Sequence, residues 1–294
     1  MTRYLRPQTL DEALALRAGT VGAAPLTMLA GGTDLYPVRT HRTAWFEPYS
    51  RDILDLSAIA ELGGIEHDAG GTRIGATATW SAVASAALPP VFDVLKQASR
   101  QVGGVQIQNR GTVGGNLCNA SPAADGVPPL LALDAEVELA SLRGRRRLPL
   151  AAFVLGNRST ALAADEILVA LHLPPQPAQA RSSFLKLGAR AYLVISIASV
   201  AAVIATDATG RIASARVVVG ACSAAPQRLA TLAARLIGQN AAPALAETVG
   251  AADLAALSPI DDVRASAAYR RDAALVLVRR TLAGLLSSPL EVAA

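Results

Sequence analysis

The sequence predicts an α+β protein in two parts, in which strands and helices alternate first and helices gather at the end. Some apolar residues recur at helical spacing, and others alternate with polar residues as in half-buried strands. A proline-rich stretch, PPQPAQARS at 174–182, follows neither pattern and is predicted to be a linker. We therefore expect one domain over residues 1–175 and a second over residues 180–294.

The composition indicates a globular chain with a large aliphatic core. Of the 294 residues, 52% are hydrophobic but only 4% are aromatic. Basic residues outnumber acidic ones by 27 to 23, but the two signs are mixed along the chain, which does not favour nucleic-acid binding. The densest basic run, RGRRR at 143–147, contains Gly144 and is predicted to be a solvated hairpin tip. A polyanion site and a subunit contact are the weaker alternatives.

The cysteines and the apolar runs limit the cellular setting. Cys118 and Cys222 are too few to bind an iron–sulfur cluster or a zinc ion by themselves, and nothing indicates a disulfide framework. The chain opens without a secretory signal pattern, and its longest apolar run, 193–205, is shorter than a typical membrane span. We expect a cytoplasmic protein with no membrane span.

The first part is predicted to begin with a helix and to continue with strands. Thr9 and Glu12 form a capping-box pair in TLDE, after which apolar residues follow at helical spacing. Thr79 is a candidate N-cap for the helix in TWSAVASAA, and the glycine pair 103–104 should end the next helix. Strands are expected in PLTML, RDILDL, TRIGAT, DAEVEL and EILVALHL, the fourth with one face in water.

The second part is predicted to place antiparallel strands before helices. FLKLG at 184–188, the apolar run from 193 and IASARVVVG at 212–220 are the expected strands. Helix-like segments then follow at 226–238, 243–257 and 264–286.

Two glycine pairs stand out, in AGGTD at 30–34 and GTVGGN at 111–116. Paired glycines after a strand let successive N–H groups line a concave nest that binds anions. With polar contacts from Thr33, Thr112 and Asn116, two such nests could hold a diphosphate. A single pair is most often only a tight turn, and neither segment matches a Rossmann or P-loop fingerprint.

No catalytic or metal-binding set emerges from the sequence. His41, His67 and His172 lack metal-ligand spacing, and no GxSxG motif is present, so any chemistry must come from a bound cofactor. Asp125 would suit ribose hydroxyls, although a turn-forming role is the favoured interpretation. Cys118 is predicted to be a small buried residue rather than a reactive thiol.

Taken together, several segments resemble the FAD-binding medium subunit of the molybdenum hydroxylases, the family of xanthine and carbon monoxide dehydrogenases. In order they are LAGGTDL, NRGTVGGNLCNASPAADGVPPLLALDAEVEL, DEILVALHLPP, FLKLGAR and ASAAYRR, which span essentially the whole chain. The resemblance implies a two-lobed FAD-binding domain of the vanillyl-alcohol oxidase (PCMH) type, followed by a smaller domain of antiparallel strands and helices. FAD would lie between the lobes, with its diphosphate on the two glycine segments.

The resemblance also implies which residues contact FAD, from the glycine segments to the flavin ring. They are Ala30, Gly31, Gly32, Thr33, Asp34 and Leu35 in the first segment, and Thr112, Gly114, Gly115 and Asn119 in the second. Asp125 matches the family's aspartate at the adenosine end of FAD. Ile167 or Leu168 matches an apolar residue near the flavin ring, and Lys186 matches a lysine near the flavin. Tyr192 would cover one face of the ring. The chain departs from the family pattern at Gln108, where an arginine is common, and at 191–196.

The implied function is electron transfer within a complex. A small partner subunit would carry two [2Fe-2S] clusters, and a large partner subunit the molybdopterin cofactor and the substrate site. The chain would pass electrons from the clusters through FAD to an external acceptor, which is NAD, a quinone, a cytochrome or oxygen. The expected assembly is a heterotrimer, with dimerisation of the trimer as an option. The alternatives are a self-sufficient flavin-dependent oxidase of the vanillyl-alcohol oxidase type and a non-catalytic assembly subunit.

Overall fold

The computed structural model describes residues 3–20, 26–45 and 51–287 and shows a mixed fold of helices and sheets, as predicted. The chain forms two compact units, each built from three stretches. The first comprises Met1–Ala86, Gly104–Ser121 and Asp134–Pro175, and the second comprises Ala87–Gly103, Pro122–Leu133 and Gln176–Ala294. Two segments that precede the proline-rich stretch thus pack with the second unit. In the predicted division into domains 1–175 and 180–294, these two segments belong to the first domain. That division stays a prediction.

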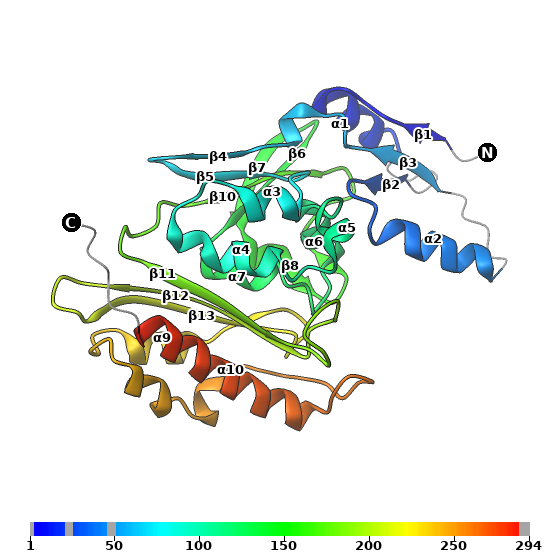
Figure 1. Cartoon of the computed structure of the whole chain (residues 1–294). Helices are drawn as coiled ribbons and strands as arrows, with labels where there is room; N and C mark the ends of the chain where they lie inside the picture. The colour runs from blue at the N-terminus through cyan, green and yellow to red at the C-terminus, as the bar shows by residue number, and fades with distance from the viewer. Residues whose placement is uncertain (1–2, 21–25, 46–50, 288–294) are drawn as a thin grey trace. The chain divides into compact units, whose positions relative to one another are not determined.

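A three-stranded parallel sheet opens the first unit (Figure 1). Its order is β1 (Tyr4–Leu5), β3 (Asp52–Asp55), β2 (Leu26–Leu29), and α1 (Leu10–Ala18) and α2 (Leu35–Ala44) belong to the same region. One half of the predicted capping box is confirmed, because Thr9 Oγ1 accepts a hydrogen bond of 3.2 Å from the amide of Glu12. The Glu12 carboxylate accepts from the amide of Gln8 at 2.8 Å instead of from that of Thr9.

A five-stranded antiparallel sheet forms the rest of the first unit. Its order is β4 (Ile65–Asp68), β5 (Gly71–Gly75), β10 (Ile167–Leu173), β6 (Glu136–Ser141), β7 (Gly144–Pro149). An apolar core that includes Leu10, Leu54 and Ile167 joins α1 and β3 to this sheet. The central strand β10 is buried except at His172, since it has a neighbour on each side and a packed layer on its faces.

Short elements connect these strands and position the two glycine segments. They are η1 (Ala60–Leu62), α3 (Trp80–Ser85), α5 (Val105–Gln108), α6 (Val113–Asn119), α8 (Leu150–Phe153), β8 (Val154–Gly156) and β9 (Ser159–Thr160). The predicted cap at Thr79 is confirmed, because its hydroxyl oxygen accepts a hydrogen bond of 3.2 Å from the amide of Ala82.

The basic run 143–147 lies in the predicted hairpin, between β6 and β7, but only Arg143 is at the tip, and residues 144–147 belong to strand β7. Its arginines are paired with carboxylates. The pairs are Arg143–Asp165, Arg145–Glu61, Arg145–Glu138, Arg146–Glu166 and Arg147–Glu138. Glu138 is only 7% exposed, so the expected wet face of DAEVEL is wrong at this residue. The carboxylate is covered because Arg145 and His172 hydrogen-bond to it and Arg147 forms an ion pair with it at 3.7 Å.

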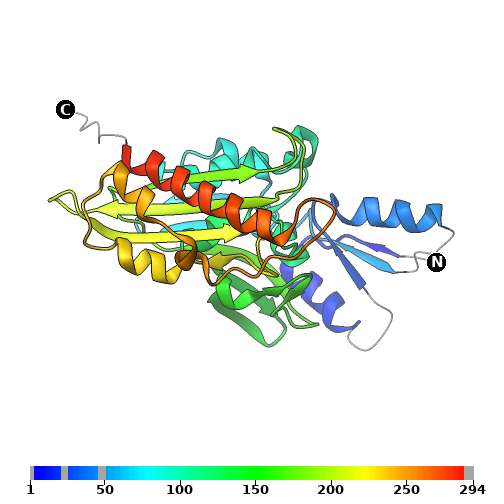
Figure 2. The same cartoon turned by 90° about the horizontal axis from the view of Figure 1, so that it is seen from below.

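The second unit is a four-stranded antiparallel sheet with helices on both faces (Figure 2). The order is β11 (Arg181–Leu187), β12 (Ala198–Thr206), β13 (Ile212–Gly220), β14 (Gln227–Arg228). One face is covered by α9 (Ala230–Leu236) and α10 (Ala267–Ser287), and the other by α4 (Asp93–Ser99) and α7 (Val127–Ala132). Because both faces are covered, eight of the nine residues of β12 are buried, which explains its unbroken apolar run.

Two of the predicted helices differ from the observed elements in the second unit. The segment 243–257 contains two short 3₁₀ helices, η3 (Pro243–Thr248) and η4 (Ala251–Leu254), in place of one α-helix. The helix expected to run up to the glycine pair 103–104 consists of η2 (Pro90–Phe92) followed by α4, which already ends at Ser99. Gly250 separates η3 from η4, in keeping with the low helix propensity of glycine.

We expect Glu166→Gln to lower the free energy of unfolding at pH 7 by about 1–3 kcal/mol. Glu166 is 4% exposed and accepts a hydrogen bond of 2.6 Å from Arg146, which holds the pKa of its carboxyl below the ordinary value. This stabilisation is fully present above the pKa of the Glu166 carboxyl in the unfolded chain, which is about 4.3. It is lost as the pH falls through the lower pKa that the same carboxyl has in the folded protein. Urea denaturation between pH 3 and pH 7 should therefore show a weaker acid dependence in the variant.

The neighbouring variant Asp165→Asn is the matched control. Its partner Arg143 is 68% exposed, so water screens the pair and its removal should change stability little. Equal losses in the two variants would contradict a specific role for the buried carboxylate.

Candidate functional site

The first glycine segment is the turn between β2 and α2. Gly32 has a φ of +75°, in the left-handed region that side chains rarely adopt. Gly31 is needed for a different reason, because a Cβ atom at this position would lie 1.8 Å from the carbonyl oxygen of Arg110. The two glycines therefore give the turn its shape and let it approach the backbone just before the second glycine segment.

This turn offers unused hydrogen-bond donors. Among the residues that the structure describes, none accepts a hydrogen bond from the amide groups of Gly31, Gly32, Thr33 or Asp34. The carbonyls of Gly32 and Asp34 accept from the first turn of α2, so the free amides lie at the start of that helix. Amides at a helix N-terminus carry partial positive charge and favour an anion.

The second glycine segment uses its amides inside the protein. The amide of Gly114 donates to the carbonyl oxygen of Ala76 at 2.8 Å, and that of Gly115 to Thr112 Oγ1 at 3.1 Å. A Cβ atom at Gly114 would lie 2.7 Å from Ala76, so this glycine lets α6 pack closely on the loop after β5. The open nest predicted from the sequence is therefore wrong for these two amides. Contact of the segment with FAD stays a prediction.

One buried polar atom near this segment lacks a partner. Asn116 Oδ1 accepts no hydrogen bond from any residue in the described part of the chain. A buried amide oxygen without a donor is costly, and a ligand with an N–H or O–H group would satisfy it.

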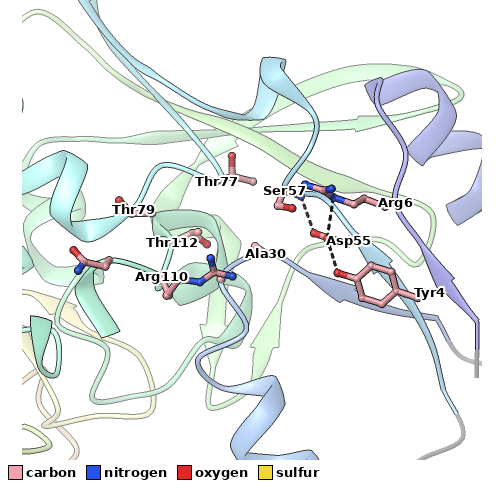
Figure 3. A pocket seen from close by; sticks show the side chains of 11 residues that line it. Tyr4, Arg6, Ala30, Asp55, Ser57, Thr77, Thr79, Arg110 and Thr112 are labelled. Carbon is pink, nitrogen blue, oxygen red and sulfur yellow. Dashed lines mark hydrogen bonds and ion pairs between the residues drawn. The ribbon is translucent and has the colours of Figure 1, made fainter. Parts of the chain in front are cut away.

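A pocket of about 460 Å³ lies where the two glycine segments meet (Figure 3). It is lined by Tyr4, Arg6, Ala30, Gly31, Asp55, Ser57, Thr77, Thr79, Asn109, Arg110 and Thr112. The lining is rich in hydroxyl groups and contains two arginines but only one carboxylate. Such a lining suits a ligand that carries negative charge.

The single carboxylate of the pocket is already neutralised. Asp55 accepts hydrogen bonds from Tyr4 Oη at 2.6 Å and from the amide of Ser57 at 2.9 Å, and it lies 3.4 Å from Arg6 Nε. Burial alone would raise the pKa of Asp55, but these hydrogen bonds outweigh it and hold the pKa below the ordinary value. The same hydrogen bond raises the pKa of Tyr4 to about 12, so the phenol stays neutral.

Asp34 and Asn119 are brought together by a residue that the sequence did not single out. Arg158 Nη1 lies 3.0 Å from Asp34 Oδ2 and also donates to Asn119 Oδ1. Asn119 Nδ2 is 3.4 Å from Asp34 Oδ1, which closes the group. Arg158 also donates its amide to the carbonyl of Ala120. The start of α2 is thereby tied to the end of α6.

Asp125 and Lys186 form a buried ion pair in the second unit. Lys186 Nζ lies 2.6 Å from Asp125 Oδ2, and the Ser196 hydroxyl donates to Asp125 Oδ1. Burial raises the pKa of the Asp125 carboxyl, while Lys186 and Ser196 act in the opposite direction. The resemblance assigns Asp125 to the adenosine end of FAD and Lys186 to the flavin end. The two side chains are in contact, and both assignments stay predictions.

The remaining candidates differ in their surroundings. Ile167 is fully buried in the core between α1 and β10, and the adjacent Leu168 is 4% exposed. Tyr192 is 82% exposed, and its carbonyl accepts a hydrogen bond of 2.9 Å from Arg190. Cys118 is only partly buried, so the prediction of a buried residue is not fully met. Its sulfur is nevertheless kept from water, which raises the pKa of the thiol to about 12, keeps the thiol protonated and agrees with a structural cysteine.

The described residues contain no group of three or more His, Cys, Asp and Glu side chains suited to hold a metal ion. Over the same residues, no helix has the length and hydropathy needed to cross a bilayer.

Comparison with protein families gives two matches that together cover most of the chain. Residues 1–176 match the family described as FAD binding domain in molybdopterin dehydrogenase. Residues 183–285 match the CO dehydrogenase flavoprotein C-terminal domain.

Individual proteins with similar sequences and structures are subunits of oxidoreductases. The nicotine 6-hydroxylase medium subunit of Paenarthrobacter nicotinovorans is 32% identical over 95% of both chains. The xanthine dehydrogenase FAD-binding subunit of Escherichia coli O157:H7 is 34% identical over 91% of this chain and 90% of its own. Reconstituted CO dehydrogenase from Oligotropha carboxidovorans superposes with a TM-score of 0.88 at 26% identity, covering 98% of this chain and 99% of that chain.

We expect Gly31→Ala to abolish flavin retention. The added Cβ would collide with the Arg110 carbonyl, so the turn must move away and the amides of residues 31–34 lose their present arrangement. The measurement is the flavin content of the purified chain, from its visible absorbance.

Gly156→Ala provides the control, because a Cβ atom at Gly156 meets nothing within 4 Å and the residue does not adopt a positive φ. It should keep normal flavin content. Normal flavin content in Gly31→Ala would contradict the role given to the turn.

Proposed function

Because the chain belongs to the family of FAD-binding medium subunits of the molybdenum hydroxylases, we propose that it carries electrons from a partner subunit to an external acceptor. The donors would be the [2Fe-2S] clusters of a small subunit, and a large subunit would hold the molybdopterin cofactor. When bound, FAD supplies the redox chemistry, since it accepts and releases electrons. The residues of this chain bind and orient the cofactor.

The observation that carries the proposal is the set of free amides at residues 31–34. They belong to a glycine turn at the start of α2, beside a pocket rich in hydroxyl groups and arginine. A diphosphate needs donors and positive charge, and this region supplies both without a rearrangement of the backbone. The residues present therefore fit the anionic part of FAD.

The proposed contacts follow from this placement. Ala30, Gly31, Gly32, Thr33 and Leu35 would form the diphosphate side of the site, together with Thr112. Gly114 and Gly115 would act indirectly, through the close packing and the capping of α6. Asp34 and Asn119 would hold the site in shape through their shared contact with Arg158.

The flavin ring would have a separate set of neighbours. Since Ile167 is taken up by the core, Leu168, which points to the opposite side of β10, is the better candidate for contact with the ring. Tyr192 is exposed and free to cover a ring face. The Asp125–Lys186 pair would contact the cofactor as a unit, because the two side chains touch.

The proposed architecture is the vanillyl-alcohol oxidase (PCMH) type. Its support is the presence, within the first unit, of a parallel three-stranded sheet and an antiparallel five-stranded sheet, which would be the two lobes. The proposed assembly is a heterotrimer with the large and small subunits, able to dimerise, in the cytoplasm. The names of the similar proteins, which include medium chains of dehydrogenases and the medium subunit of a hydroxylase, support the presence of partners.

The experiment compares the complex containing the wild-type chain with the complex containing Gly31→Ala. After chemical reduction of the partner clusters, the wild-type complex should transfer electrons to a soluble acceptor dye, and the flavin-free complex should not. Stopped-flow absorbance follows cluster reoxidation in both, and cofactor analysis checks that the molybdenum and iron contents are equal.

Other results would point to the rival functions. A purified wild-type chain that oxidises an organic substrate without partners would be a self-sufficient oxidase. A wild-type complex that contains no FAD after gentle purification would make the chain an assembly subunit.

A further inference from the structure

Arg110 lies at the junction of the two glycine segments. Its carbonyl contacts the backbone of Gly31, and Thr112, two residues further along the chain, is the N-cap of α6. Its side chain lines the pocket next to Ala30 and Thr112, apart from the group formed by Tyr4, Asp55 and Arg6 (Figure 3). The backbone of Arg110 is therefore fixed beside both glycine segments, and its exposed side chain extends from there into the pocket.

Arg110 differs from the other arginine of the pocket in its partners. Arg6 lies 3.4 Å from the Asp55 carboxylate, so these two charges offset each other. Across residues 3–20, 26–45 and 51–287, no side chain or backbone group forms a hydrogen bond or an ion pair with the Arg110 guanidinium. The pocket thus has one positive charge that no group in the described part of the chain compensates.

The hydroxyl groups of the pocket are oriented in a way that adds donors. The oxygen atoms of Thr79 and Thr112 accept hydrogen bonds from the amides of Ala82 and Gly115 as helix caps. Each hydroxyl still has a proton to donate, because a threonine hydroxyl is one donor and two acceptors. These protons and the guanidinium give the pocket donors that suit an acceptor-rich anion.

We propose that Arg110 is the residue that neutralises the diphosphate of FAD, a role that rests on the proposed FAD-binding function. The free amides of residues 31–34 contribute only partial charges, whereas a diphosphate carries full negative charges that are costly to remove from water without a cation. A guanidinium can bind phosphate oxygens through two parallel N–H groups, which an ammonium cannot do.

The test measures the dissociation constant of FAD for the full-length chain, by quenching of flavin fluorescence at several salt concentrations. Arg110→Gln should weaken FAD binding about tenfold to a hundredfold at low salt, as expected for the loss of a charge-assisted hydrogen bond. The salt dependence of the dissociation constant should also become flatter, since screening acts on the charge that the variant lacks. Arg110→Lys should keep the salt dependence but bind less tightly than the wild type.

Arg143→Gln is the matched control, because it removes the same charge from an exposed arginine on the β6–β7 hairpin outside the pocket. It should leave FAD binding unchanged. Equal weakening in Arg143→Gln and Arg110→Gln would overturn the proposal, as would an unchanged dissociation constant in Arg110→Gln.

A wild-type chain that binds no FAD would overturn the proposed function itself. That result is distinct from a failure of the role of Arg110, in which the wild-type chain binds FAD and Arg110→Gln binds it equally well. Circular dichroism confirms folding, and Arg110→Lys carries the test if the glutamine variant does not fold.

Discussion

The candidate site depends on the contact between the backbones of Gly31 and Arg110. A Cβ atom at residue 31 would lie 1.8 Å from the Arg110 carbonyl oxygen, so only glycine permits the contact. The contact places the free amides of residues 31–34 beside Thr112 and the pocket. A cofactor that binds there meets groups from two segments lying far apart in the chain. The sheets and helices of the first unit hold these segments in place.

Local features were predictable from the sequence because they depend on neighbouring residues. Thr9 and Thr79 cap helices as expected, and the apolar and alternating runs form strands. Both glycine segments could also be recognised in the sequence, but the sequence did not indicate that their amide groups are hydrogen-bonded differently. Gly114 donates its amide to Ala76, which belongs to another part of the chain, whereas the amides of the first segment find no acceptor among the described residues. A glycine pair alone does not carry that information.

Long-range pairing explains the features that the sequence did not reveal. Glu138 looked like a solvent-facing strand residue, yet arginines of the adjoining hairpin strand cover it. Asp125 and Lys186, 61 residues apart, form a single buried pair. The sequence did not distinguish Arg110 and Arg158 from the other arginines, because their importance depends on their surroundings in the fold. Arg110 has no side-chain partner among the described residues, whereas Arg158 contacts both Asp34 and Asn119.

The most direct test of the account is hydrogen–deuterium exchange of the chain with and without FAD. The amides of residues 31–34 have no partner in the part of the chain that the structure describes, so they should exchange quickly without the cofactor and slow markedly when FAD saturates the chain. The amides of Gly114 and Gly115 are already hydrogen-bonded and should change much less. Fast exchange at residues 31–34 in the FAD-saturated chain would contradict the claim that this turn holds the diphosphate.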